Sequence, residues 1–383
     1  MKKIIYVLIM VFLAAPVFAA EDIKIDSPAK EETKVDCPAD EVIKLGASEE
    51  TNFTTRLVGG IDKFIKDEKV INFEKGPIDS FAVGATFQGL LNMHFTEQDP
   101  ELRSNYPLFT EIWTRTRFEN GKSEIRASFL PSRDLSGFDR KFNGAIFDLY
   151  YKRKLGKHHS IIIGNSRVPI GMDTVIHPSN TLFVKSAQMT AAYGNRSTGI
   201  RLQGDYGIVY YDVGGYFSTR FMQDWGEGYE TVDRITIKPF NNHEGSVFQN
   251  LKFGAGVNYG RRGGDYTVSD VSASWDYKKW LVQAEYANAN GSNGSVYNPK
   301  RSQSFYATLG YYITDKLQIL GRYDVFDPDK THSNDLITQY TAGLNYYVIG
   351  QRLKFALNYV LEQNQALQNN HKQYILFMTQ VQI

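Results

Sequence analysis

The sequence predicts an all-β protein, a transmembrane antiparallel β-barrel of about sixteen strands with a short N-terminal periplasmic extension. Three observations lead to this prediction. The chain opens with an export signal, apolar and polar residues alternate from Phe81 to the C-terminus, and tight turns alternate with longer polar loops. Outside the signal, no stretch reaches the ~18 consecutive apolar residues of a membrane-spanning helix.

Residues 1–19 have the features of a secretory signal peptide. Two lysines follow Met1, an apolar stretch occupies residues 4–15, and Val17 and Ala19 place small side chains at the cleavage positions. We expect cleavage after Ala19, because the segment is too short and wrongly flanked to serve as a retained anchor. Together with the strand pattern, this predicts export to the bacterial outer membrane.

The composition argues against several classes of function. A formal net charge of +1 argues against nucleic acid as the partner. The single cysteine, Cys37, cannot form an internal disulfide. The chain has no G-x-S-x-G or H-E-x-x-H motif and no phosphate-cradling glycine loop, so the sequence predicts no enzyme, no cofactor and no metal site.

Residues 20–78 form the predicted periplasmic lead. Residues 20–50 are rich in charge and poor in aromatic side chains, which is typical of a disordered segment. Residues 55–69 are compatible with a short helix, although Gly59 and Gly60 disfavour it. The barrel is expected to occupy residues 79–383.

The main evidence for the barrel is alternation with a period of two. Phe81, Val83 and Phe87 share one face of their segment, and Leu353 and Phe355 do so near the C-terminus. Successive side chains of a strand point to opposite faces, so each segment has one apolar and one polar face. The predicted strands cover residues 81–95, 107–119, 122–131, 143–155, 157–168, 196–205, 207–220, 229–240, 249–262, 265–277, 279–290, 303–313, 315–327, 338–349, 351–363 and 371–383.

The connections are short at one rim and longer at the other, with two exceptions. Residues 241–248 are long for a turn, and residues 263–264 are short for a loop. This layout is that of bacterial outer-membrane barrels, and an even strand count places both chain ends on the periplasmic side. A soluble β-sandwich or β-helix is the alternative, but sandwiches usually have shorter strands.

Four segments resemble the phosphate-selective porin O and P family, in the order that the family has them. Residues 164–171 (GNSRVPIG) resemble its G-x-x-K-x-P-F-G segment, and residues 195–200 (NRSTGI) resemble its entry to the next strand. Residues 233–239 (DRITIKP) and 321–328 (GRYDVFDP) are similar to two of its strand ends. The resemblance extends over about residues 80–383, because the last hairpins also look like those of the family.

The resemblance implies a sixteen-stranded, trimeric pore that favours anions. Two features depart from the family pattern. Arg167 stands where the family often has lysine, and the chain ends in Ile383 rather than in the aromatic residue usual for outer-membrane barrels.

The longest predicted loop, residues 169–195, is the candidate constriction, since a loop at this place in porins folds inward. Closely placed cations would be needed to replace water around a phosphate anion. One lysine and a flanking arginine fall short of that, so a neutral constriction with a polar lining is the alternative. The candidate residues are Asp173, His177, Lys185, Gln188 and Arg196.

Alternation also assigns charged side chains to the lumen, where rings of charge set the selectivity of a channel. We count 11 basic and 8 acidic residues there, which predicts a weak anion preference at most. The alternative is that these charges pair across neighbouring strands and stiffen the wall. The candidate pore-lining residues are Arg115, Arg117, Arg126, Lys152, Arg167, Arg201, Arg234, Lys238, Arg322 and Asp324.

Two functional hypotheses follow. The first is a porin for passive diffusion of small hydrophilic solutes or anions, surrounded by outer-membrane lipid and lipopolysaccharide and assembled as a homotrimer. The second is a barrel without a pore, acting as a structural anchor or adhesin. The second would require long outer loops or a separate binding domain, and the predicted loops are of modest length.

Overall fold

The computed structural model describes most of the predicted barrel and none of the signal peptide. Cys37, the predicted lead up to residue 68 and nearly all of the helix considered at 55–69 lie outside the described residues. The described residues are 69–95, 100–131, 146–218, 228–292, 297–367 and 371–383.

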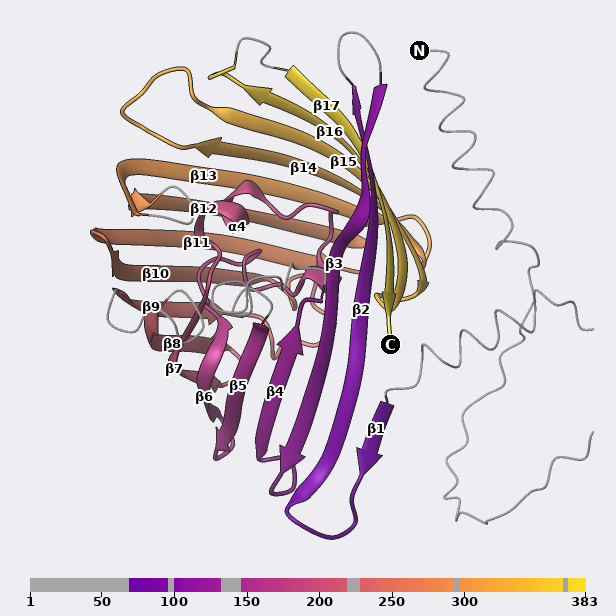
Figure 1. Cartoon of the computed structure of the whole chain (residues 1–383), viewed down its shortest axis with the longest axis vertical. Coiled ribbons are helices and arrows are strands. Elements are labelled where there is room, and N and C mark those ends of the chain that lie inside the picture. The colour runs from indigo at the N-terminus through magenta and orange to yellow at the C-terminus, as the bar shows by residue number, and fades with distance from the viewer. Residues whose placement is uncertain (1–68, 96–99, 132–145, 219–227, 293–296, 368–370) are drawn as a thin grey trace, which may run out of the picture. The chain divides into compact units, whose positions relative to one another are not determined.

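Sixteen strands, β2 to β17, close into an antiparallel barrel (Figure 1). Each strand pairs with the next along the chain, and β17 returns to pair with β2. The predicted fold class is confirmed, and each predicted strand overlaps one observed strand. The strands are β2 (Ile78–Phe95), β3 (Pro100–Phe118), β4 (Ser123–Phe129), β5 (Ile146–Leu155), β6 (His159–Arg167), β7 (Arg196–Asp205), β8 (Val209–Ser218), β9 (Gly228–Ile237), β10 (Lys252–Arg262), β11 (Asp265–Tyr277), β12 (Trp280–Ser292), β13 (Tyr297–Tyr312), β14 (Leu317–Asp327), β15 (Ile337–Ile349), β16 (Leu353–Asn364) and β17 (His371–Gln382).

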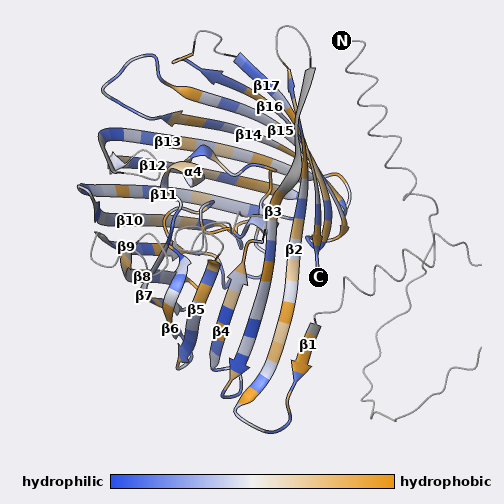
Figure 2. Ribbon diagram, in the orientation of Figure 1, coloured by the Kyte–Doolittle hydropathy of each residue, from blue (hydrophilic) through white to orange (hydrophobic). Residues whose placement is uncertain are grey.

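The two faces of the barrel wall differ as the alternation predicts. On β2, Phe87 is 46% exposed on the outer face, whereas its neighbours Thr86 and Gln88 are 1% and 2% exposed on the lumen side. Hydrophobic and hydrophilic residues alternate along the strands in Figure 2. Polar residues are therefore buried inside the barrel and apolar residues are exposed outside, which is the reverse of a soluble protein.

The β9–β10 connection, residues 238–251, is the long turn that the sequence singled out. The indole Nε1 of Trp275 donates to the carbonyl of Val247 at 2.7 Å, and Asn250 Nδ2 donates to the carboxylate of Asp276 at 2.9 Å. These bonds fasten the turn to β11. The β10–β11 connection is the short loop at 263–264, also as predicted.

A seventeenth strand, β1 (Lys69–Asn72), lies within the segment that the sequence assigned to the lead. It pairs with residues 80–83 of β2. The last residue of the chain, Ile383, bonds to the next part of the same β2 edge, because its N–H and carbonyl each pair with Ala85 at 2.9 Å. β1 therefore continues along the edge of β2 where β17 ends.

Gly164 changes the side-chain pattern of β6 immediately before the longest loop. Its φ is +128°, which disfavours any residue with a side chain. A Cβ atom at this position would stand 2.3 Å from the carbonyl oxygen of Leu149. After it, Asn165 and Ser166 are both 3% exposed, so strict alternation stops.

Candidate functional site

The loop between β6 and β7, residues 168–195, lies inside the barrel, and its helix α4 (Gln188–Tyr193) contacts β12, β13 and β14 (Figure 1). A short 3-10 helix, η2 (Pro178–Asn180), precedes α4. No helix in the described part of the chain is long and apolar enough to cross a membrane. The sequence predicted the loop and its inward fold, but neither helix.

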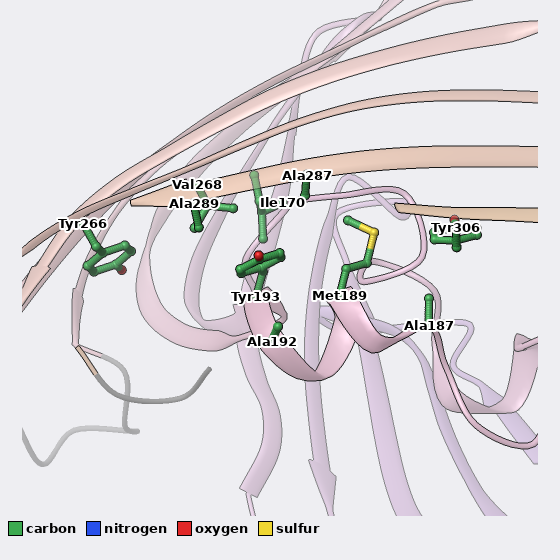
Figure 3. Packing of buried hydrophobic residues seen from close by; sticks show 10 residues of the cluster. All are labelled: Ile170, Ala187, Met189, Ala192, Tyr193, Tyr266, Val268, Ala287, Ala289 and Tyr306. Atoms are coloured by element: carbon green, nitrogen blue, oxygen red, sulfur yellow. The ribbon is translucent and has the colours of Figure 1, made fainter. Parts of the chain in front are cut away.

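One side of this loop packs on an apolar part of the lumen wall (Figure 3). Met189 and Ile170 are each 1% exposed, and they pack with Ala287 and Ala289 of β12. The small alanine side chains leave space for α4. The hydroxyl of Tyr193 lies 2.8 Å from that of Ser302, and burial raises the pKa of Tyr193 to about 12, so this phenol stays neutral.

Three lumen carboxylates accept backbone N–H groups of the loop. Asp270 accepts from Gly171 at 3.0 Å, and Asp324 accepts from Gln188 at 2.9 Å. Glu285 accepts from Met172 and, at 3.1 Å, from Asp173. These bonds supply partners to loop N–H groups that have left bulk water.

Lumen cations and amides donate to the loop carbonyls in the same way. Arg322 Nη1 donates to the carbonyl of Lys185 at 3.1 Å, and Lys354 Nζ donates to that of Thr181 at 3.0 Å. Further donors to the loop are Gln88, Asn345 and Gln380. Arg322 and Asp324, both predicted to line the pore, therefore hold the loop in place.

Two of the predicted constriction residues stabilise the loop. The carboxylate of Asp173 accepts from the N–H of Ala187 at 2.9 Å and from the hydroxyl of Thr190 at 2.7 Å, where α4 begins. Gln188 donates from its side-chain amide to Asp324 at 3.3 Å. Both side chains are occupied by contacts within the protein.

The other three predicted constriction residues contact side chains of the barrel wall. His177 Nε2 is 3.0 Å from Glu111 of β3. Arg196 lies 3.0 Å from Asp148 and over the ring of Phe147. Lys185 is exposed, with its ammonium 5.1 Å from the centroid of the Tyr374 ring.

The lumen side of β3 to β7 carries a group of cations that we call the basic wall: Arg115, Arg126, Lys152 and Arg201. All four are partly exposed rather than buried. Arg115 and Arg126 stand directly opposite each other on β3 and β4. Like charges in that position destabilise a sheet. Both guanidinium groups also lie near the Trp113 ring, at 5.6 and 5.2 Å from its centroid.

Several predicted pore-lining cations pair with carboxylates, as the alternative interpretation expected. The pairing predicted for Arg322 and Asp324 is present at 3.6 Å. The closest contact is that of Arg234 with Asp270, at 2.6 Å. The other pairs are Arg117 with Glu124 at 3.2 Å, Arg126 with Glu111 at 3.4 Å, Arg201 with Asp212 at 3.7 Å and Lys238 with Asp205 at 4.0 Å.

A cavity of about 350 Å³ opens between the first part of the loop and β7 to β9. Arg167 Nη1 donates to the carbonyls of Thr174 and, at 3.0 Å, Ile176, so this arginine joins the loop to the cavity wall. The lining residues are Arg167, Pro169, Met172, Val175, Arg201, Gln203, Tyr210, Asp212, Arg234 and Thr236.

Sequence reasoning missed two side chains of this site. Trp113 lies on the same face of β3 as Arg115, so the alternation of residues could have placed it in the lumen. Asp270 lies on the buried face of β11 and was absent from the predicted lumen charges. No group of three or more potential metal ligands occurs among the described residues.

Two of three comparisons relate the chain to known proteins. Residues 253–383 match the family described as Phosphate-selective porin O and P, which confirms the resemblance over this part of the chain. A comparison with curated protein sequences found no match. The barrel is similar to OmpF of Salmonella typhi, solved with daunomycin, at a TM-score of 0.61 and 12% identity, covering 83% of this chain and 100% of that one.

Two further solved structures share the fold. OmpT of Vibrio cholerae superposes with a TM-score of 0.56 at 11% identity, covering 82% of this chain and 100% of that one. A porin from Comamonas acidovorans, described as anion-selective, has a TM-score of 0.54 at 10% identity and covers 83% of this chain and 100% of that one. At such identities the likeness establishes the fold alone.

Proposed function

We propose that this protein is an outer-membrane porin through which small hydrophilic solutes diffuse passively, with a weak preference for anions. The observation that carries the proposal is a loop bonded across the lumen of a closed sixteen-stranded barrel, opposite the basic wall. Such a loop narrows the channel, so solutes are sieved as they diffuse and no covalent step is involved. The family match over residues 253–383 supports the same function.

The preference for anions follows from how the lumen charges are used. Arg322, Asp324 and Lys354 are engaged with the loop backbone, so they contribute little to the field in the water-filled part. The basic wall is partly exposed, although Arg126 lies 3.4 Å from Glu111 and Arg201 lies 3.7 Å from Asp212. Partly exposed charge of one sign along a pore favours the opposite ion.

The same proposal covers location and assembly. The outward apolar face fits lipid, and the exposed rings of Trp280, Tyr346 and Tyr359 fit the interfacial region at the headgroups. We propose an outer-membrane location reached through the N-terminal signal, contact with lipopolysaccharide in the outer leaflet, and a homotrimer as the family resemblance implies.

The purified full-length protein, folded in detergent, tests this function in planar bilayers. We expect stepwise conductance increments and greater permeability to chloride, sulfate or phosphate than to potassium. Substitution of Lys185, the exposed loop cation, by glutamine should weaken that preference. Folded protein that stays electrically silent would contradict the proposal and favour a barrel without a pore.

A further inference from the structure

The cavity between the loop and β7 to β9 combines a cationic edge with an apolar side. Met172, Val175 and Pro169 of the loop and Tyr210 of β8 contribute the apolar surface. Val175 is 44% exposed although it belongs to a loop inside the barrel. This exposed apolar surface is available to a solute.

Arg167 offers this cavity an unused hydrogen-bonding edge. Its Nη1 donates to two loop carbonyls, which fixes the guanidinium. Among the described residues, neither its Nε nor its Nη2 has a hydrogen-bond acceptor, and these two atoms form the edge that binds a carboxylate with two parallel bonds. The loop thus holds the Arg167 guanidinium in place, and the same residue lines the cavity.

The charge around the cavity fits a singly charged ligand. Arg167, Arg201 and Arg234 contribute three cations to the lining. Asp212 accepts from Gln203 at 2.7 Å and lies 3.7 Å from Arg201, and Asp270 pairs with Arg234 at 2.6 Å. Three guanidinium groups and two carboxylates leave one net positive charge, which does not match a multiply charged phosphate.

We propose that this cavity is a subsite for small organic monocarboxylates with an apolar body, such as a phenyl group. The carboxylate binds the Nε and Nη2 edge of Arg167, and the apolar body contacts Val175, Met172 and the Tyr210 ring. A volume of about 350 Å³ lies within the range of small-molecule sites. Such sites hold their ligand with a mainly apolar lining and a few precisely placed polar groups. The inference rests on the proposed pore, because the solute reaches the cavity through the lumen.

Competition with chloride current in planar bilayers tests the subsite, with benzoate, acetate and inorganic phosphate as probes. We expect benzoate to reduce the current at a concentration about tenfold lower than acetate, since burial of an apolar group of this size is worth at least ~1.4 kcal/mol. Phosphate should act no better than acetate. Arg167→Gln should weaken the effect of both carboxylates.

Val175→Asn should remove most of the difference between benzoate and acetate, and Val175→Thr should reduce it if the asparagine variant fails to fold. The matched control is Val247→Asn, because Val247 is also 44% exposed but lies in the β9–β10 turn. The control should keep the wild-type difference. Chloride current that benzoate and acetate reduce equally, or that phosphate reduces best, would overturn the subsite and leave the porin standing. Absence of any current would instead overturn the proposed function, and the subsite with it.

Discussion

At the scale of residues, many polar side chains of the lumen form hydrogen bonds with the backbone of the loop at residues 168–195. Loop N–H groups bond to Asp270, Glu285 and Asp324, and loop carbonyls bond to Arg322 and Lys354. A buried backbone group without a partner costs about as much as a lost hydrogen bond. Many charged side chains of the lumen are therefore bonded to the loop backbone. The lumen charges that are not bonded to it are the ones that can influence ions in the pore.

Substitution of Arg322 by glutamine tests this assignment. The variant loses donors to the carbonyls of Lys185 and Ser186 and leaves Asp324 without its nearby cation. Breaking a buried ion pair on one side typically costs about 3 kcal/mol or more. We expect a lower unfolding temperature, measured by comparing heated and unheated samples on gels. The ionic current through single channels should also be noisier. Arg261→Gln, at an exposed arginine, should stay within about 0.5 kcal/mol of wild type.

Gly164→Ala tests the geometry at the start of the loop. The added Cβ would meet the Leu149 carbonyl oxygen at 2.3 Å, at a φ of +128°. Strained backbone of this kind costs about 1–3 kcal/mol, and displacement of β5 adds to it. The Gly164→Ala variant should therefore unfold at a lower temperature than wild type. Gly321→Ala is the control, because a Cβ there would have no heavy atom within 4 Å, and an equal loss in both variants would contradict the account.

Asp329, in the β14–β15 loop, gives a pH-dependent prediction. The hydrogen bond from Lys300 holds the pKa of its carboxyl well below the ordinary value of 3.8, with a further contribution from Thr331. A lowered pKa means that the stabilisation is present above pH 3.8 and is lost as pH falls below it. Hydrogen exchange of residues 328–336 should be slower in wild type than in Asp329→Asn at neutral pH. That difference should vanish as the pH falls below 3.8. A difference that persists there would show that the ionised carboxylate of Asp329 is not its cause.

At the scale of elements, α4 is stable because it lies against small residues of the wall. Six residues are too few for a stable isolated helix. Met189 is 1% exposed and packs with Ala287 and Ala289, so packing rather than propensity maintains the helix.

Met189→Ala should therefore loosen the loop. Truncation of a buried methionine costs about 2–5 kcal/mol, and we expect a larger and more variable conductance with the barrel intact. Met93→Ala, on the outer face of β2, should leave the current unchanged. Equal currents in the two variants would show that α4 does not determine the width of the pore.

The strands were predictable from sequence and the loop interior was not, for a physical reason. A strand of the wall has one lipid face and one lumen face, so the alternation of apolar and polar residues shows where the strand lies in the sequence. The loop has no periodicity, and its conformation depends on side chains such as Asp270 and Asp324, which are distant in sequence. β1 was missed because four residues are too few to show alternation.

At the scale of the whole molecule, the lumen charges fall into two groups. The wall from β11 to β17 supplies most of the charges that hold the loop, joined by Arg167 of β6 and Glu111 of β3, and the wall from β3 to β7 keeps partly exposed cations. The sequence placed most of these charges in the lumen, but the count of 11 basic and 8 acidic residues could not show which of them are engaged. The distribution, more than the net charge, is what predicts an anion preference.

The most direct test is the reversal potential of the full-length protein in a potassium chloride gradient, compared with that of Arg115→Gln/Arg126→Gln. We predict that the wild-type potential shifts toward the chloride equilibrium value and that the double variant moves back toward zero, because the paired cations of the basic wall are removed. A cation-selective wild type, or a double variant with an unchanged reversal potential, would contradict the account.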